Sequence, residues 1–303
     1  MIRVLPTDMN GSARTPATGH LFNVNPDMKK LPKETAQIFH HLVAKLLDLS
    51  RHKIQDIQMA AALLCTRVQA PDDNSYKKIT KVMQYLHCTK ELTLTIKPGD
   101  SAHLWVDSLY TIHSDMCSHS GIFMMLRIGV AYSTLCKINT ESSTEAELVA
   151  INDAMGQVLW TRHFLAAQSM VVPTMKIYQD KKSTILLTEN GTTSSSKRTK
   201  HLNVWYFFIM DKINNGEVKV AYSSTNNMLS DFFTKPLHST AFVHMHKKIL
   251  NLPTSISMAV HWSVFDSKNY EMAQGQKQSG LEGPKRSNAV DGKGCHAQGL
   301  KLA

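Results

Sequence analysis

The sequence predicts an α/β protein in which helices pack on a mixed β-sheet and a small helical subdomain precedes that sheet. Two observations predict this class. Apolar residues recur at helical spacing between residues 34 and 86, and from residue 92 short apolar runs typical of strands alternate with longer helical patterns. A passage from strand to helix to strand favours parallel pairing, whereas a hairpin pairs antiparallel. The sheet should therefore contain both kinds of pairing.

Length and charge bound the possible functions. The chain has 303 residues, which suits about two domains of roughly 150 residues each. Hydrophobic residues make up 43%, enough for a packed core, and the formal net charge is +10. A basic surface favours a polyanionic partner, with nucleic acid as the first candidate. A positive charge that only keeps the protein soluble would explain the net charge of +10 equally well. The motifs must therefore decide between a nucleic-acid partner and simple solubility.

Cysteine usage and the absence of long apolar runs bear on the compartment. The five cysteines are widely spaced and form no C-x-x-C pair, which argues against a disulfide framework or a zinc site and fits a reducing compartment. The first twenty residues lack the apolar core of a signal peptide, and no run approaches the ~20 apolar residues of a membrane span. We therefore expect a soluble, intracellular protein, cytoplasmic or nuclear, with no membrane partner.

The first third of the chain predicts an irregular arm followed by helices. Residues 1–33 carry scattered proline, glycine, asparagine and threonine without periodicity, as an arm would. Helices are predicted over 34–50 and 54–68, and a third begins after a cap at Asn74 or Ser75. Lysine and arginine on these helices are interpreted as a solvated face, with a nucleic-acid contact as the alternative. The apolar stripe of the third helix contains Ile79, Val82, Met83 and Leu86.

Strand candidates begin after these helices. Residues 92–96 alternate apolar and polar side chains, as a half-buried strand does. Gly129 is placed to turn two later runs into a hairpin. Those runs and three others predict strands at 103–107, 121–126, 130–137, 175–179 and 217–222.

Helices are interspersed with these strands. A long helical pattern covers residues 143–168, with Thr144 or Ser143 as its N-cap, and a short late helix holds Asp231. Further helices are predicted over 181–189, 201–213 and 241–250.

Two segments do not fit a packed element. Residues 192–200 are polar and basic, so they form either a mobile surface loop or a loop that contacts phosphates. Residues 253–303 have few apolar side chains towards their end and should be a largely disordered tail. The candidate phosphate contacts in the basic loop are Ser196, Lys197, Arg198 and Lys200.

Four carboxylates lie in contexts that suit one shared cleft. Asp107 and Asp180 each end a predicted strand, Glu147 lies near the start of the long helix, and Asp231 lies on the late helix. Clustered carboxylates repel one another, and such oxygen ligands suit Mg²⁺. Glu145 points to a different helix face from Glu147, so we interpret it as a charge at the helix start.

Six separated stretches stand out, in this order: Trp-Val-Asp (105–107), Ser-Asp-Met-Cys-Ser-His-Ser-Gly (114–121), Ser-Ser-Thr-Glu-Ala-Glu-Leu-Val-Ala (142–150), Tyr-Gln-Asp (178–180), Lys-Arg-Thr-Lys-His-Leu-Asn-Val (197–204) and Met-Leu-Ser-Asp-Phe-Phe-Thr-Lys-Pro-Leu (228–237). Together they resemble the C-terminal part of copia-type retrotransposon polyproteins, where the end of the reverse transcriptase precedes a ribonuclease H. His119 and His201 also match positions of this family and are interpreted as structural.

The resemblance implies a fold and its boundaries. It implies a ribonuclease H-like domain with a mixed five-stranded sheet and flanking helices over residues 98–252. A helical remnant of the reverse transcriptase, similar to a thumb or connection, would precede it at 34–97. The motif Tyr-x-Asp-Asp of the family's polymerase palm does not occur in the sequence. We therefore expect no polymerase activity from this chain alone, and a reverse transcriptase polymerase domain is a candidate partner.

The resemblance also implies an activity. Asp107, Glu147, Asp180 and Asp231 would be the catalytic acids that bind two Mg²⁺ ions, with Mn²⁺ as the alternative metal, and an RNA–DNA hybrid would be the substrate. The ions would clamp the scissile phosphate and activate the attacking water. Lys181 and the residue after it depart from the small polar residue that usually follows the third acid.

Two other functions stay open. A catalytically inactive retroelement fragment that only binds nucleic acid is the main alternative. An integrase-like transferase would need three acids in a different order along the chain, and the motif around Asp231 disfavours it.

Overall fold

The computed structural model describes residue 9 and residues 11–97, 102–190, 203–237 and 239–252. The predicted phosphate-contacting loop and the predicted tail at 253–303 lie outside these residues, as does His201. None of the helices among the described residues is both long and apolar enough to cross a bilayer.

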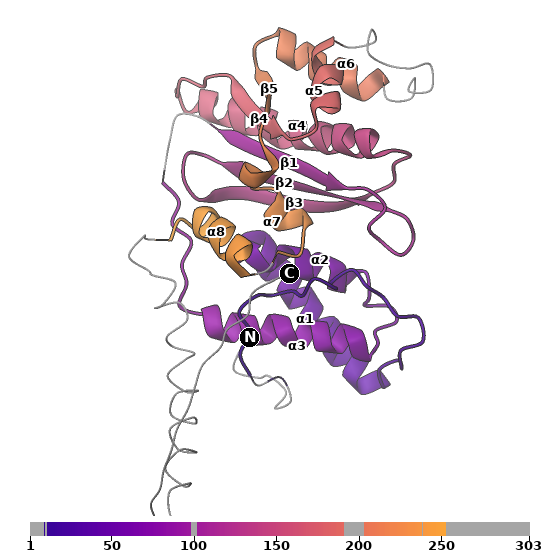
Figure 1. Ribbon diagram of the computed structural model, residues 1–303. Coiled ribbons are helices and arrows are strands. Elements are labelled where there is room, and N and C mark those ends of the chain that lie inside the picture. Colours follow the sequence, from indigo (N-terminus) through magenta and orange to yellow (C-terminus); the bar gives the residue numbers. More distant parts are fainter. Residues whose placement is uncertain (1–8, 10, 98–101, 191–202, 238, 253–303) are drawn as a thin grey trace, which may run out of the picture. The chain divides into compact units, whose positions relative to one another are not determined.

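The helical region packs around a core of apolar side chains that includes Phe39, Leu46, Leu64, Ile79 and Met83. The predicted second helix begins as a 3-10 turn and continues as an α-helix. The α-helices of this region are labelled in Figure 1. The elements are α1 (Lys33–His52), η3 (Gln55–Ile57), α2 (Gln58–Cys65) and α3 (Asp73–Thr89).

The start of α3 corrects one prediction. Asn74 and Ser75 do not cap this helix. Asp72 has the extended backbone of an N-cap, and its Oδ1 accepts hydrogen bonds from the Ser75 amide and the Ser75 hydroxyl, both at 2.8 Å. Arg67 Nη2 lies 3.1 Å from the other carboxylate oxygen of Asp72. The predicted apolar stripe of this helix is confirmed, because all four of its residues are buried.

The sheet has the strand order β3-β2-β1-β4-β5, so the predicted mixed five-stranded sheet is confirmed. β1 pairs antiparallel with β2 and β2 with β3, whereas β4 pairs parallel with both β1 and β5. The strands are β1 (His103–Leu109), β2 (Ser118–Met125), β3 (Val130–Ile138), β4 (Met175–Gln179) and β5 (Val218–Tyr222).

The predicted strand at 92–96 is wrong. This segment forms no ladder with any of the described residues, and the isolated bridge between Lys97 and Ile128 follows it. Its alternating pattern has another cause, because Leu92 and Leu94 line an apolar pocket beside α8. Gly129 turns the β2–β3 hairpin with φ +79°, and a Cβ there would lie 2.4 Å from the Thr95 carbonyl oxygen. The hairpin turn therefore touches this segment without forming a sheet with it.

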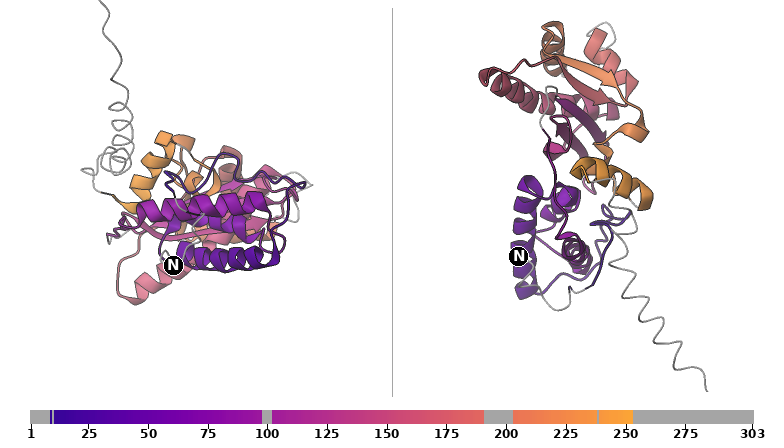
Figure 2. Two further views of the ribbon diagram at one scale, coloured as in Figure 1. Left: turned by 90° about the horizontal axis from the view of Figure 1, so that it is seen from below. Right: turned by 90° about the vertical axis from the view of Figure 1, so that its left-hand side faces the viewer.

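Helices cover both faces of the sheet (Figures 1 and 2). On one face, α4 buries Ile151 and Met155 against Leu104, Ile122 and Ile177 of the strands. The elements on this face are α4 (Ser143–Ala167), α5 (Lys182–Asn190) and α6 (Asn203–Asn214). The other face carries α7 (Asp231–Thr234) and α8 (Ser239–Leu250), which follow the 3-10 turn η6 (Thr225–Asn227).

A buried polar cluster joins the helical region to α8. The Asp56 carboxylate accepts a hydrogen bond from the Tyr85 hydroxyl, and its Oδ2 lies 2.9 Å from His246 Nε2. All three side chains are buried. Gln58 Nε2 also donates to the Ser133 carbonyl of β3 at 3.1 Å. Buried polar groups are costly without partners, so this network favours one docking of α2 and α3 against the second half of the chain.

Candidate metal centre

Three of the four predicted acids converge. Because β1 and β4 are parallel neighbours, their carboxyl ends share one sheet edge. Asp107 lies near the end of β1, Asp180 directly follows β4, and Glu147 lies in the second turn of α4. Each offers a carboxylate oxygen, and these oxygens all lie within 4.8 Å of one another. Asp107 and Glu147 are buried and Asp180 is half-buried.

The N-terminus of α4 decides which glutamate faces the other acids. Ser142, rather than the predicted Ser143 or Thr144, is the N-cap, because its backbone is extended and its Oγ accepts from the Glu145 amide at 3.1 Å. Glu145 Oε2 in turn accepts from the Glu141 amide at 2.7 Å. The Ser142 hydroxyl thus caps the Glu145 amide, and the Glu145 carboxylate accepts from the residue that precedes the N-cap. Glu145 thus belongs to the helix start.

Gln179 orients two of the acids, a role that the sequence analysis missed. Its side chain is buried between β4 and α4. Nε2 donates to Glu147 Oε2 at 3.0 Å, while Oε1 accepts from the backbone amides of Asp180 and Lys181 at 2.7 and 3.0 Å. One amide therefore fixes both the rotamer of Glu147 and the turn that carries Asp180.

A glycine opposite Asp107 lets α7 approach that acid. In the β1–β2 register Asp107 faces Gly121. A Cβ at Gly121 would lie 2.6 Å from Thr234 Cγ2 and 3.4 Å from Phe233 Cβ, so α7 would be displaced by any other residue. With glycine there, the Thr234 hydroxyl donates to Asp107 Oδ2 at 2.5 Å.

Asp231 lies beside the three acids but is paired with a cation. Lys235 Nζ lies 2.7 Å from Asp231 Oδ1 and 3.7 Å from Asp107 Oδ2. The group of oxygens within 4.8 Å consists of Asp107, Glu147 and Asp180 only, among the residues that the structure describes. Lys235 therefore links the fourth acid to the first.

The two lysines after Asp180 are engaged elsewhere. Lys181 Nζ donates to Ser143 Oγ at 2.6 Å, and Lys182 Nζ lies 5.3 Å from the centre of the Tyr222 ring. These two lysines depart from the family pattern, but their ammonium groups contact other partners than the three acids.

Burial and mutual repulsion raise the pKa values of the acids. Burial is the main cause, and it raises the pKa of Asp107 to about 7 although Lys235 and Thr234 oppose the shift. Burial and the charge of Asp107 raise the pKa of Glu147 to about 8. Burial also raises the pKa of Asp231 against the hydrogen bond from Lys235. Burial would lower the pKa of Lys235, but the charges of Asp107 and Asp231 leave it raised.

The donor set fits a hard divalent cation. Three carboxylates from three elements offer oxygen ligands at one point, which is the chemistry that Mg²⁺ and Mn²⁺ prefer. The raised pKa values mean that these acids hold protons more readily than free carboxyl groups do. A bound cation would stabilise the charged carboxylates and so cause these protons to be released.

His119 takes part in packing. It is buried, its Nδ1 lies 3.2 Å from His113 Nε2, and its ring meets Phe22 of the arm edge-on. Burial lowers the pKa of His119 to about 4, so the ring stays neutral.

Comparisons with known proteins agree with the resemblance predicted from the motifs. The chain is 27% identical over 227 residues to the retrovirus-related Pol polyprotein from transposon RE2 of Arabidopsis thaliana, a match that covers 73% of this chain and 15% of the polyprotein. It is 24% identical over 242 residues to that from transposon TNT 1-94 of Nicotiana tabacum, which covers 75% of this chain and 18% of the polyprotein. The chain therefore spans less than a fifth of the length of these relatives. No protein-family model matches it.

The solved structures that match the chain include a ribonuclease H1 and a viral protease–reverse transcriptase. A ribonuclease H1 isolated from compost is 12% identical with a TM-score of 0.36, and the match covers 44% of this chain and 92% of that chain. A foamy viral protease–reverse transcriptase in complex with an RNA/DNA hybrid is 12% identical with a TM-score of 0.32, covering 45% of this chain and 19% of that chain. The mixed five-stranded sheet with flanking helices is the architecture that the motif resemblance implies. The curated relatives of the chain are retrovirus-related Pol polyproteins of copia-type transposons.

Proposed function

We propose that this chain is a retrotransposon-derived ribonuclease H that hydrolyses RNA in RNA–DNA hybrids with divalent cations. The single observation that supports it most is the convergence of Asp107, Glu147 and Asp180 at one sheet edge. Mg²⁺ ions, when bound there, would neutralise the phosphate and lower the pKa of a nucleophilic water.

The protein's own residues would hold this arrangement. Asp107, Glu147 and Asp180 supply ligand oxygens, and Gln179 keeps Glu147 turned towards the other two acids. Asp231 is the fourth acid of the proposal and would join the cluster only when Lys235 moves away from it. The Thr234 hydroxyl holds one oxygen of Asp107, which leaves the other for the cation.

The substrate would be recognised by shape and charge. A hybrid of RNA and DNA differs from either duplex in groove width and in the 2′-hydroxyl groups of one strand, which carry no sequence information. The net charge of +10 favours binding of a polyanion. The predicted contacts Ser196, Lys197, Arg198 and Lys200 remain part of the proposal.

Cleavage of a labelled RNA–DNA hybrid tests the proposal. The parent protein should cut the RNA strand with Mg²⁺ and stop when a chelator is added. D107N, E147Q and D180N should each lose at least about 100-fold in rate, because positioned charge is the main catalytic contribution here. E145Q is the matched control, since Glu145 lies two residues from Glu147 but belongs to the helix cap. Equal loss in E145Q and E147Q would contradict the assignment.

The alternative function is binding without cleavage. The pairing of Asp231 with Lys235 favours it, because a cation already occupies the side of Asp107 that faces the fourth acid. Salt-sensitive binding of the hybrid by a parent protein that does not cut it, at any Mg²⁺ or Mn²⁺ concentration, would support this alternative.

A further inference from the structure

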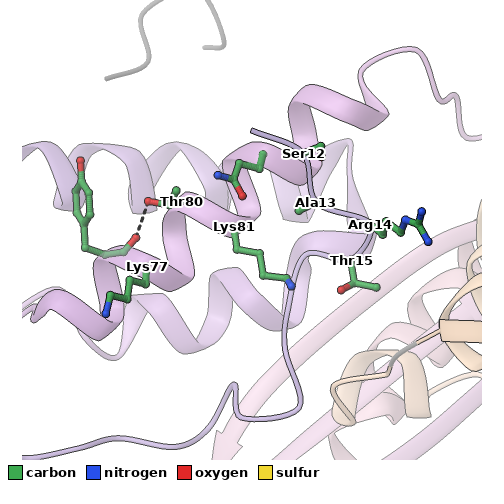
Figure 3. Close-up of a pocket in the computed structure, with 9 residues that line it drawn as sticks. Ser12, Ala13, Arg14, Thr15, Lys77, Thr80 and Lys81 are labelled. Atoms are coloured by element: carbon green, nitrogen blue, oxygen red, sulfur yellow. Dashed lines mark hydrogen bonds between the residues drawn. The ribbon is translucent and has the colours of Figure 1, made fainter. Parts of the chain in front are cut away.

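A basic pocket lies in the helical region, on α3. This pocket of about 570 Å³ lies between α3 and the arm segment 12–15. Figure 3 shows the residues that line it. Its lining includes three cationic side chains, Arg14 from the arm and Lys77 and Lys81 from α3, and no carboxylate. Ligand pockets in proteins commonly have volumes of about 300–1,000 Å³. This one is therefore large enough for more than a single ion.

The arm forms one wall because small and apolar residues anchor it against α3. Met9, Ala13 and Ala17 are buried. Gly11 has φ +142°, a backbone conformation that side-chain-bearing residues rarely adopt, so glycine favours this path of the arm. Further along, Lys78 Nζ donates to the Asn23 carbonyl at 2.7 Å. The arm is therefore packed against α3, and Lys78 contributes to this packing through its hydrogen bond to Asn23.

Two lysines of α3 line the pocket. Lys77 and Lys81 project from the same side of α3 (Figure 3), one turn apart, or about 6 Å along the helix axis. Neither lysine has an ion pair with any of the residues that the structure describes. The Thr80 hydroxyl, between them, donates to the Tyr76 carbonyl at 2.9 Å and is occupied. The pocket thus offers two ammonium groups at a regular spacing.

We propose that this pocket binds the phosphodiester backbone of a nucleic-acid strand, with Lys77 and Lys81 contacting successive phosphates. Two spaced ammonium groups without a carboxylate suit a chain of phosphates. A single phosphate monoester is disfavoured. Such ligands usually sit on backbone amides at a helix N-terminus, whereas Lys77 and Lys81 lie beyond the first turn of α3. This site does not depend on the acids of the metal centre.

Salt-dependent binding tests the proposal separately from cleavage. All proteins would carry D107N and be kept in a chelator, so that nuclease activity has no bearing on the result. The probes are a fluorescein-labelled single strand of about 16 nucleotides and the matching RNA–DNA hybrid. Anisotropy titrations at several salt concentrations give the slope of log K against log salt, which counts phosphate contacts.

K77Q/K81Q should flatten this slope by about 1.4 for the single strand or about 1.8 for the hybrid, the loss of two contacts. The probe that shows the change identifies the strand form. K33Q/K45Q removes the same charge from exposed positions of α1 and should leave the slope within the error. K77R/K81R keeps the charge and should keep the slope, and an unchanged melting temperature of K77Q/K81Q excludes misfolding as the cause.

Two results would overturn the proposal. One is an equal slope in the parent, K77Q/K81Q and K33Q/K45Q proteins with both probes. The other is binding of inorganic phosphate that depends on Lys77 and Lys81, together with an unchanged slope for nucleic acid. That result would assign the pocket to a small anion.

Discussion

Lys235 bridges Asp231 and Asp107, with Nζ at 2.7 Å from Oδ1 of the former and 3.7 Å from Oδ2 of the latter. Its side chain is about one-third exposed while both carboxylates are buried. An ammonium in this position supplies, in part, the positive charge that a divalent cation would bring. Lys235 and a metal ion are therefore competitors for the same acids.

Replacing Lys235 tests this competition. K235M should lower the melting temperature in chelator at pH 8, by about 2–4 °C for each kcal/mol lost, because buried acids lose their counter-ion. The same variant should bind Mg²⁺ more tightly, measured as a larger stabilisation at low Mg²⁺. K176M, at an exposed position of β4, is the control. Weaker Mg²⁺ binding by K235M would contradict the competition.

The raised pKa values predict how stability depends on pH. Asp107 and Glu147 have folded-state pKa values of about 7 and about 8, above their ordinary values. At these two carboxyl groups the folded state therefore binds more protons than the unfolded state between about pH 4 and pH 8, and their contribution to stability falls as pH rises through that window.

Thermal unfolding in chelator at pH 5 and pH 8 measures this effect. The parent protein should melt at a lower temperature at pH 8, and Mg²⁺ should restore most of the difference. D107N should show a smaller drop, because one of the two groups no longer titrates. A parent protein whose melting temperature rises from pH 5 to pH 8 relative to D107N would refute the prediction.

Gln179 should matter for both stability and cleavage. Q179L removes three hydrogen bonds at once and leaves Glu147 Oε2 and two backbone amides without that partner. Unsatisfied buried groups cost about 1–3 kcal/mol each, so chemical denaturation should show a clear loss. Cleavage should fall as well, since Glu147 is free to turn away. Q157L on α4 loses one hydrogen bond to Thr161 and is the control. Equal stability of the two variants would count against the role of Gln179.

The buried Asp56–Tyr85–His246 cluster should stabilise the docking of α8. D56A leaves the Tyr85 hydroxyl and His246 Nε2 without their shared acceptor, so it should cost about 1–3 kcal/mol or more. Y85F should cost less, because His246 still contacts Asp56. D48A, at an exposed position of α1, should change the free energy of unfolding by less than about 0.5 kcal/mol. A loss in D56A no larger than that in D48A would show that the cluster is not stabilising.

The elements and the acids could be predicted from the sequence because their signals are local. The buried faces of α3, α4 and the strands follow from periodicity, and Asp107 and Asp180 end apolar runs that became β1 and β4. The strand predicted at 92–96 failed because Leu92 and Leu94 alternate towards a pocket beside α8. An alternating pattern of apolar and polar residues indicates which side chains are buried. It does not indicate whether a neighbouring strand or another element buries them.

The supporting residues could not be predicted because their roles depend on register and packing. Gly121 matters only because it pairs with Asp107 and lies under Thr234. Gln179 was visible within the motif Tyr-Gln-Asp, but nothing in the sequence states that its side chain reaches Glu147. Lys235 stands four residues after Asp231, a spacing typical of a helical ion pair. Its contact with Asp107 required the fold.

A crystal of the protein soaked in Mn²⁺ tests the central claim most directly. Anomalous scattering locates manganese independently of any assumption about activity. The account predicts a peak bounded by carboxylate oxygens of Asp107, Glu147 and Asp180, and the loss of that peak in D107N. Full loading with Mn²⁺ at other sites, with none between these three side chains, would contradict it.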